Sequence, residues 1–300
     1  MRKILKREQT WDEILFDIFL IIMTVVLLIV FIYPLYYLVI CSFSEVDAVF
    51  NGEVKFLPVG FSLESYKLLL ARDDIWQGYL MSASIVLTGT IINLFFTLLG
   101  AYVCACPEFL PRNVLMKVMT FTMFFSGGLI PEFMLIKNLG LYDTYWALIL
   151  PGAINVTNLI IARTFFMNSI PNELREAAIL DGCSHTRMLI SVVLPLSKAI
   201  IAVMALYYGV SHWNSYFNAM IYLGDDSIAP LQLVLRQILL AASRTGEDTG
   251  ADIKTILRQV RLAEQLKYSS VVVASLPALI AYPFVQKYFV KGVMIGSVKG

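Results

Sequence analysis

Long apolar runs constrain the fold of this chain more than any other feature of its sequence. A helix that crosses a bilayer needs about 20 consecutive, mostly apolar residues. Six runs meet that length, at residues 14–41, 79–105, 114–136, 144–167, 198–223 and 268–290. We therefore predict an all-α integral membrane protein with six transmembrane helices.

The composition agrees with a membrane protein and argues against a soluble domain. Charged residues make up 15% of the chain, against about 25% in an average soluble protein. The net charge of +1 provides no general attraction to nucleic acid, so we expect membrane lipid and no nucleic acid as partners. The four cysteines lack the spacing of a zinc site and are interpreted as small packing residues.

The basic residues predict the orientation of these helices. Thirteen of the 23 Lys and Arg residues lie at the N-terminus, at the C-terminal end, and in or beside the connections that follow the second and fourth runs. Short cytoplasmic loops are enriched in Lys and Arg, so we expect both termini to be cytoplasmic. The external connection 224–267 nevertheless holds six basic residues of its own. The first run, about 28 residues long, is too long for the apolar core of a signal peptide and is predicted to be a retained helix.

This topology divides the chain into a simple order of segments. The predicted segments are a cytoplasmic N-terminus (1–13), the first helix with an external loop (14–78), a core of five helices (79–290) and a cytoplasmic tail (291–300). Within the core, 168–197 would form a cytoplasmic loop and 224–267 an external loop. The external loop is expected to contain a helix near 230–242 and an exposed stretch at 244–251.

The connection between the fourth and fifth runs predicts a short helix, a sharp turn and a second helix. Pro171 suits the start of a helix, and Glu173 and Glu176 would lie near the positive end of its dipole. Gly182 can adopt the left-handed conformation that ends a helix. Ser184 can then cap the second helix.

The short helix would present a face of small residues. Ala177 and Ala178 would let another protein approach closely, with Leu174 and Asp181 on the same face. The alternative is an amphipathic connector on the membrane surface, whose alanines only favour helix.

This connection resembles a known family. Glu176-Ala177-Ala178, Asp181-Gly182 and Leu194-Pro195-Leu196 together resemble the cytoplasmic EAA loop of ABC importer permeases. Cys183 departs from the family pattern, in which Ala often follows the Gly.

The resemblance extends over nearly all 300 residues. Trp213-Asn214 is similar to the Trp-Asn of sugar permeases, and residues 288–300 are similar to the tail of the maltose-type second permease. The external segment 127–131 (Gly-Gly-Leu-Ile-Pro) resembles the branch of polysaccharide and multiple-sugar permeases.

The resemblance implies a fold, a mechanism and partners. It implies the six-helix core of a type I ABC importer permease, the binding-protein-dependent transport component of a bacterial cell membrane. The loop helix would insert into a separate ATPase subunit, and ATP binding would switch the spans from inward-facing to outward-facing. The implied partners are a second homologous permease subunit, two ATPase subunits, an extracytoplasmic solute-binding protein and a carbohydrate. The residues implied for ATPase coupling are Glu173, Glu176, Ala177, Ala178, Asp181, Gly182 and Pro195.

The chain carries no signature of ATP hydrolysis. It contains no Gly-Lys dipeptide and so no phosphate-binding loop of the Gly-Lys-Ser/Thr kind. We expect no catalytic residue, no cofactor and no metal in this chain, and ATP and Mg²⁺ on the partner ATPase subunits.

Polar residues in the fourth and fifth runs are candidates for the substrate pathway. Such residues at membrane depth usually face a wet cavity, although they can instead tie helices together. The candidates are Asn155, Asn158, His212, Trp213, Asn214, Tyr216 and Asn218. Asn214 and Asn218 would lie one helical turn apart and are the favoured lining pair. His212 is interpreted as a satisfied structural histidine, because no intramembrane carboxylate is available to it.

Other functions remain as alternatives. A permease for a non-sugar solute would share the same loop. An ion-coupled secondary carrier usually has buried midplane carboxylates, which the second to sixth runs lack. A membrane enzyme would need a catalytic cluster, and no such motif occurs.

Overall fold

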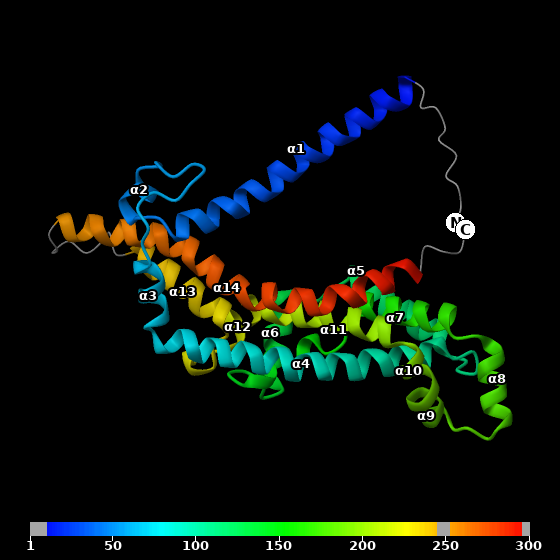
Figure 1. The fold of residues 1–300 in the computed structure, drawn as a ribbon. Coiled ribbons are helices and arrows are strands. Elements are labelled where there is room, and N and C mark those ends of the chain that lie inside the picture. The colour runs from blue at the N-terminus through cyan, green and yellow to red at the C-terminus, as the bar shows by residue number, and fades with distance from the viewer. Residues whose placement is uncertain (1–10, 245–252, 296–300) are drawn as a thin grey trace. The chain divides into compact units, whose positions relative to one another are not determined.

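The computed structural model describes residues 11–244 and 253–295, and most of them lie in helices (Figure 1). In this part of the chain the one isolated β-bridge pairs Ser44 with Phe61. The prediction of a helical fold is therefore confirmed. The chain packs as two units, one formed by Met1–Ala71 with Leu239–Val273 and the other by Arg72–Ile238 with Ala274–Gly300.

The first unit starts with a long apolar helix, α1 (Trp11–Ser42). Its first turn carries Asp12 and Glu13, which the positive end of the helix dipole favours. Nearly all of its side chains are exposed up to the last two turns, where Ile40 and Cys41 pack against α2 (Val46–Phe50). A helix that is apolar all round and exposed in water would be unstable, so this exposure indicates a membrane-facing helix.

Polar contacts fold the segment that follows α1. The buried amide of Gln265, in α14 (Ile253–Ile295), donates to the Ser44 carbonyl at 2.5 Å. Arg261 of the same helix pairs with Asp47 at 2.5 Å. The short helix α3 (Glu64–Leu70) completes this part of the unit. The predicted loop 42–78 is thus an ordered structure with buried side chains.

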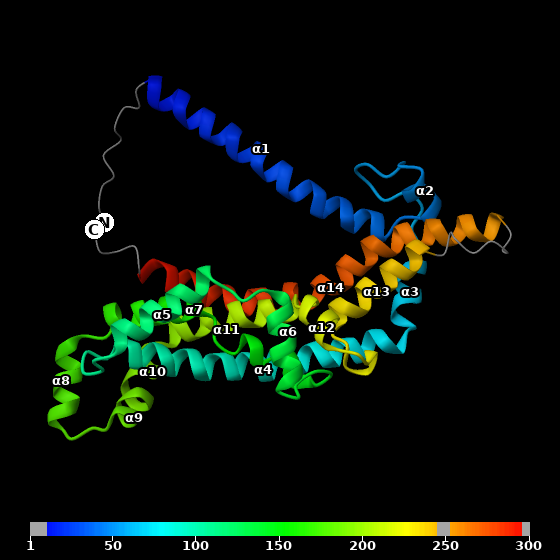
Figure 2. The same ribbon diagram turned by 180° about the vertical axis from the view of Figure 1, so that it is seen from behind.

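The second unit is organised around α4 (Asp73–Ala105). In both views α4 runs alongside α7 (Val156–Ser169) and α11 (Lys198–Trp213) (Figures 1 and 2). Their shared core contains Leu98, Ala101, Leu159, Ala162, Phe166 and Met204. A Cβ at Gly100 would lie 2.9 Å from the Leu159 side chain, so α4 approaches α7 closely because a glycine stands there.

Two of the predicted runs are bent rather than straight. The third consists of α5 (Arg112–Phe124) and α6 (Leu129–Asn138), which meet at 116°. Gly128 at the bend has φ +86°, a conformation that costs little only for glycine. The fourth run begins with two 3₁₀ turns, Tyr145–Leu148 and Leu150–Gly152, and bends by 49° into α7.

The fifth and sixth predicted runs also differ from the structure. The fifth is interrupted after α11 and resumes as α12 (Phe217–Tyr222). The sixth lies within α14, which begins at Ile253, well before the predicted start at residue 268. The helix predicted near 230–242 is confirmed as α13 (Leu231–Arg244).

The connection between α12 and α13 is closed by local polar contacts. Asp143, with φ +58°, accepts hydrogen bonds from the backbone of Gly224 at 2.8 Å and of Asp225 at 3.1 Å. The backbone N–H and the hydroxyl of Ser227 both donate to Asp225 and lower the pKa of that carboxyl. This connection is therefore an ordered, hydrogen-bonded turn.

Among the described residues, α1 and α4 are long and apolar enough to cross a membrane, and three bent helix pairs raise the number to five. Those pairs are α5 with α6, the 3₁₀ turns with α7, and His185–Leu196 with α11. The predicted exposed stretch 244–251 lies outside the described residues apart from Arg244. The predicted tail 291–300 is helical to Ile295, and the rest of it lies outside the described residues, as do the first ten residues of the predicted N-terminal segment.

Candidate coupling loop and substrate cavity

The predicted helix–turn–helix between the fourth and fifth runs is confirmed. Helix α8 (Asn172–Leu180) follows Pro171, whose extended backbone precedes the first turn. Gly182 ends it with φ +72°. Ser184 then caps α9 (His185–Met188) by accepting a hydrogen bond from the Arg187 N–H at 3.4 Å.

Helix α8 has a solvent-facing side and a side that faces the protein. Glu173, Glu176 and Ala177 are exposed, and Leu180 at the end of the helix is 87% exposed. Ala178 is half-buried and packs against the core of the second unit. The two alanines therefore face different ways, and only Ala177 is exposed to an approaching surface, whereas the sequence had suggested that both would be.

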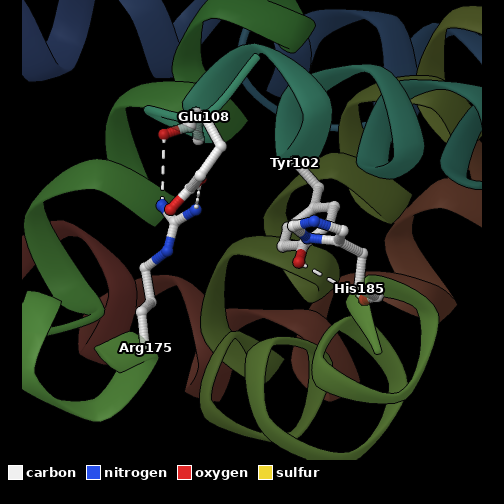
Figure 3. A network of polar contacts seen from close by, with 5 residues as sticks. Tyr102, Glu108, Arg175 and His185 are labelled. Carbon is white, nitrogen blue, oxygen red and sulfur yellow. Dashed lines mark hydrogen bonds and ion pairs between the residues drawn. The ribbon is translucent and has the colours of Figure 1, made fainter. Parts of the chain in front are cut away.

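A largely buried arginine fixes α8 to the end of α4 (Figure 3). The Arg175 side chain is 12% exposed and pairs with Glu108 at 2.9 Å. Its guanidinium also donates to the carbonyl of Ala105, the last residue of α4, at 3.3 Å. Unpaired carbonyls carry the negative end of the helix dipole there, so a cation is stabilised at this position.

Two further contacts hold the same end of α4. The Tyr102 hydroxyl donates to the carbonyl of His185 at 3.3 Å, as Figure 3 shows. Arg163 of α7 donates to the Cys104 carbonyl at 2.9 Å. The loop is thus attached to α4 through both α8 and α9.

Sequence reasoning missed Arg175 and its partners. Arg175 lies three residues before Ala178 and so on the same, inward side of α8. An arginine on the inward side of an amphipathic helix signals a polar partner inside the protein. The sequence had suggested an exposed position for Ala178 and so did not identify that side.

The second part of the loop bends sharply before α11. A π-helical turn (Leu189–Val193) leads into α10 (Leu194–Leu196), which contains the exposed Pro195. A proline removes one backbone donor and clashes with the carbonyl four residues earlier, and a widened turn relieves that clash. The chain then turns by 84° at the buried Ser197. Pro195 therefore shapes the entry into α11, while Asp181 lies exposed at the end of α8.

A cavity of about 890 Å³ opens in the second unit between α7, α11 and α14. Four of the seven predicted pathway residues line it, namely Asn155, Asn158, His212 and Asn218. Its remaining lining is apolar or hydroxyl-bearing: Leu148, Gly152, Leu206, Tyr207, Tyr208, Val210, Ser211, Ser215 and Tyr282. No Asp, Glu, Lys or Arg is among these lining residues.

The other three predicted residues have structural partners and do not line this cavity. Trp213 donates from its indole nitrogen to the Ala274 carbonyl at 2.9 Å and so ties α11 to α14. Asn214 caps the end of α11 by donating to the Val210 carbonyl at 2.9 Å. The Tyr216 ring lies beneath the Arg236 guanidinium, 5.3 Å from its centre.

The prediction that Asn214 and Asn218 lie one turn apart on a single helix is wrong. Helix α11 ends at Trp213, and α12 starts only at Phe217. The Asn214 amide is a second donor to the Val210 carbonyl, which also accepts from the Asn214 backbone N–H at 3.1 Å. Only Asn218 of the pair reaches the cavity.

One nitrogen of His212 has a structural partner, as expected of a structural histidine. Its Nε2 lies 2.6 Å from Oδ1 of Asn93, a fully buried residue of α4. Asn93 also donates to the carbonyls of Gly152 and Ala153, at 2.6 and 3.0 Å. Asn93 thus joins α4, α11 and the turn before α7. Sequence reasoning did not single it out, although it is a lone amide within an apolar run.

Comparison with known proteins identifies the family. No family model matches the chain. It is 39% identical over 287 residues to the polygalacturonan/rhamnogalacturonan transport system permease protein YtcP of Bacillus subtilis (strain 168), covering 95% of this chain and 99% of that protein. It is 40% identical over 267 residues to protein LplC of the same organism, covering 89% of each.

A solved structure agrees with these relatives. The fold matches a bacterial ABC transporter involved in the import of the acidic polysaccharide alginate, with a TM-score of 0.83 and 28% identity. The match covers 95% of this chain and all of that one. The helical membrane fold and these matches define an ABC transporter permease, and the chain belongs to the sugar permeases of that class. An ion-coupled carrier and a non-sugar permease are not favoured.

Proposed function

We propose that this chain is one of two permease subunits of a bacterial importer that moves an oligosaccharide or polysaccharide fragment into the cell. The second, homologous permease would complete the pathway, and an extracytoplasmic binding protein would deliver the cargo. Two separate ATPase subunits would bind ATP and Mg²⁺. The chain itself would carry no enzymatic activity and no cofactor.

The single observation that carries this proposal is the geometry of α8. It is a short helix with a largely buried arginine on its inward side. Its exposed side carries Glu173, Glu176, Ala177 and Leu180. ATP binding to a separate subunit can shift the transmembrane helices between two conformations only through a contact that differs between those conformations. A helix that is exposed outward and fixed inward to α4 provides such a contact.

The remaining coupling residues would support this helix. Asp181 and Gly182 end it, and the left-handed backbone of Gly182 sets the turn toward α9. Pro195 would set the direction of the chain into α11. We assign no direct ATPase contact to Ala178, because it packs against the core.

We further propose six spans with both termini in the cytoplasm. The basic residues of the short connections support this orientation, and α14 contains the sixth apolar run. The loop 168–197 would then be cytoplasmic, and 42–78 and 224–267 external.

The cargo would pass along the cavity beside α11. Its uncharged amides, hydroxyls and tyrosines suit sugar hydroxyls. The relatives named above are a polygalacturonan/rhamnogalacturonan permease and a transporter that imports the acidic polysaccharide alginate. Asn155, Asn158, His212 and Asn218 would contact the cargo. Trp213, Asn214 and Tyr216 would position the helices around it.

The test is substitution of Glu176 and Gly182 in the assembled, reconstituted transporter. We expect Glu176→Ala to weaken the ATPase contact and Gly182→Ala to strain the turn by about 1–2 kcal/mol. Uptake of labelled trigalacturonate, alginate trisaccharide or arabinotriose would be measured together with ATP hydrolysis. We expect uptake to fall at least tenfold while the subunits still copurify.

Asn113→Ala is the matched control, because Asn113 is an exposed residue of α5 outside the loop. Its uptake should equal that of the unmodified protein. Unchanged uptake in both loop variants would refute the coupling role of α8. A purified functional transporter without any ATP-hydrolysing subunit would refute the whole proposal.

A further inference from the structure

The orientation of the Asn93 amide is fixed by the groups around it. Its nitrogen donates to the carbonyls of Gly152 and Ala153, at 2.6 and 3.0 Å. Backbone carbonyls only accept, so the amide cannot be turned around without leaving both of them opposite an acceptor. Its oxygen therefore faces His212, and Oδ1 lies 2.6 Å from Nε2.

This orientation determines which nitrogen of His212 carries the proton. An amide oxygen only accepts hydrogen bonds, so Nε2 must donate. In the neutral imidazole, Nδ1 then has no proton and is an acceptor. The tautomer of His212 is thus set by Asn93, which is itself set by the turn before α7.

Gly89 determines how the imidazole lies against α4. A Cβ at Gly89 would be 2.5 Å from Nε2 and 2.8 Å from Cε1 of His212. The Nε2 edge of the ring therefore packs where α4 has no side chain. Nδ1 is not among the three ring atoms nearest to that position, and no protein partner for it is found among the described residues. The residue itself lines the cavity.

We infer that His212 is a specificity-determining residue whose Nδ1 accepts a hydrogen bond from a hydroxyl group of the carbohydrate. The inference rests on the proposed function, because it assigns one contact within the cavity proposed for the cargo. A carboxylate oxygen cannot donate to a lone pair, so this position favours hydroxyl over carboxylate groups of an acidic sugar. The absence of charged side chains among the lining residues fits the same preference.

A donor of the same cavity complements this acceptor. The side-chain oxygen of Asn155 accepts from the Asn158 N–H at 3.1 Å, which leaves its amide nitrogen to donate. A hydroxyl group both donates and accepts, so it can use groups of both kinds. This combination is the chemistry that recognises a sugar ring.

The tautomer can be measured without any cargo. Nitrogen-15 NMR of the reconstituted transporter, labelled at histidine, would be recorded for the unmodified protein and for His212→Gln, and the difference spectrum gives the His212 signals. The chain has only two histidines, and His185→Gln identifies the other. We expect a protonated Nε2 and an unprotonated Nδ1, and a mixture of both tautomers in Asn93→Leu. A proton on Nδ1 in the unmodified protein would overturn the inference.

Two substitutions of His212 separate its two nitrogens in transport. An asparagine places its amide near the position of Nδ1, and a glutamine places its amide near that of Nε2. His212→Gln should therefore keep the contact with Asn93 and lose the acceptor, while His212→Asn should do the reverse. We expect His212→Gln to raise the KM for uptake by about 3- to 10-fold, the effect of one neutral hydrogen bond, with little change in the maximal rate.

The cargo in this experiment is whichever of trigalacturonate, alginate trisaccharide and arabinotriose the unmodified transporter takes up. His212→Asn should have the lower KM of the two variants. Equal KM values for His212→Gln and the unmodified protein would show that His212 only joins helices, and would leave the proposed function intact. ATP hydrolysis without uptake of any of the three by the unmodified transporter would instead overturn the proposed function, and this contact with it.

Discussion

At the residue scale, glycines and polar residues of α4 determine how its neighbours pack. Gly89 admits the imidazole of His212, and Asn93 on the next turn fixes that ring. Because Gly89 has no side chain, the His212 ring can approach α4 closely enough to reach the buried Asn93. Without His212, the Oδ1 atom of Asn93 would lose this hydrogen-bond donor.

Substituting Gly89 tests this arrangement. The Cβ of Gly89→Ala would lie 2.5 Å from Nε2 of His212 and would displace the imidazole from Asn93. We expect the variant to lose about 1–3 kcal/mol of stability, as is typical of an overpacked core. Thermal unfolding in detergent, followed by the reactivity of the buried thiols Cys104 and Cys106, would measure the loss.

Gly209→Ala is the matched control for this prediction. A Cβ at Gly209 in α11 would meet Thr90 and Val86 at 3.8 Å, an ordinary contact distance. Alanine is also the better helix former by about 1 kcal/mol. This variant should be as stable as the unmodified protein or more so. A Gly89→Ala variant of equal stability would contradict the packing seen here.

At the element scale, α8 is held by side-chain contacts to the end of α4 rather than by a large apolar interface. Arg175 contributes a charge-assisted bond to Glu108 and a bond to a free helix carbonyl. Hydrogen bonds to charged groups are worth about 1.5–3 kcal/mol when partly buried. Arg175 is therefore the residue whose loss should free α8 from α4.

Replacing Arg175 should loosen this helix. In Arg175→Ala we expect faster hydrogen–deuterium exchange in α8 and at least tenfold weaker uptake, because motion of α8 would no longer be passed to α4. Basal ATP hydrolysis should persist. Arg175→Lys should have an intermediate effect, since lysine lacks the planar fork of the guanidinium.

Glu108→Gln is the comparison for this prediction. The Glu108 side chain is 47% exposed, and an exposed ion pair contributes only about 0–1 kcal/mol. The bond from Arg175 to the Ala105 carbonyl remains in this variant. Uptake should fall much less than in Arg175→Ala. Normal uptake and normal exchange in Arg175→Ala would show that α8 is held by apolar packing alone.

At the scale of the whole molecule, the proposed topology places the loop 168–197 and the loop 42–78 on opposite sides of the membrane. Two exposed residues, Asn113 and Asn51, lie in connections predicted to face opposite sides. We expect a membrane-impermeant maleimide to label Asn51→Cys in whole cells. It should label Asn113→Cys only in inverted vesicles.

The native cysteines affect the design of this labelling experiment. Cys41, Cys104 and Cys106 are buried, whereas Cys183 is partly exposed. The experiment therefore uses a Cys183→Ser background, and that background without added cysteines should remain unlabelled in both preparations. Labelling of Asn113→Cys in whole cells would place the coupling loop outside the cell and contradict the proposed function.

Features that depend on local chemistry could be predicted from the amino-acid sequence alone. Apolar length predicted the membrane helices α1 and α4, because a bilayer demands satisfied backbone groups over a fixed thickness. Pro171, Gly182 and Ser184 predicted the two loop helices, because capping and positive φ are properties of single residues. The loop resembles ABC importer permeases, and Trp213-Asn214, the tail and segment 127–131 resemble sugar permeases. Both resemblances agree with the family found by comparison.

The pairing of distant polar groups could not be predicted without the folded structure. The interruption of α11 separated Asn214 from Asn218, and Trp213 found its partner 61 residues away in α14. Asn93 meets His212 and Arg175 meets Glu108 across gaps of 119 and 67 residues. Such pairs depend on how helices approach one another, and that approach is set by many weak packing contacts that no short stretch of sequence contains.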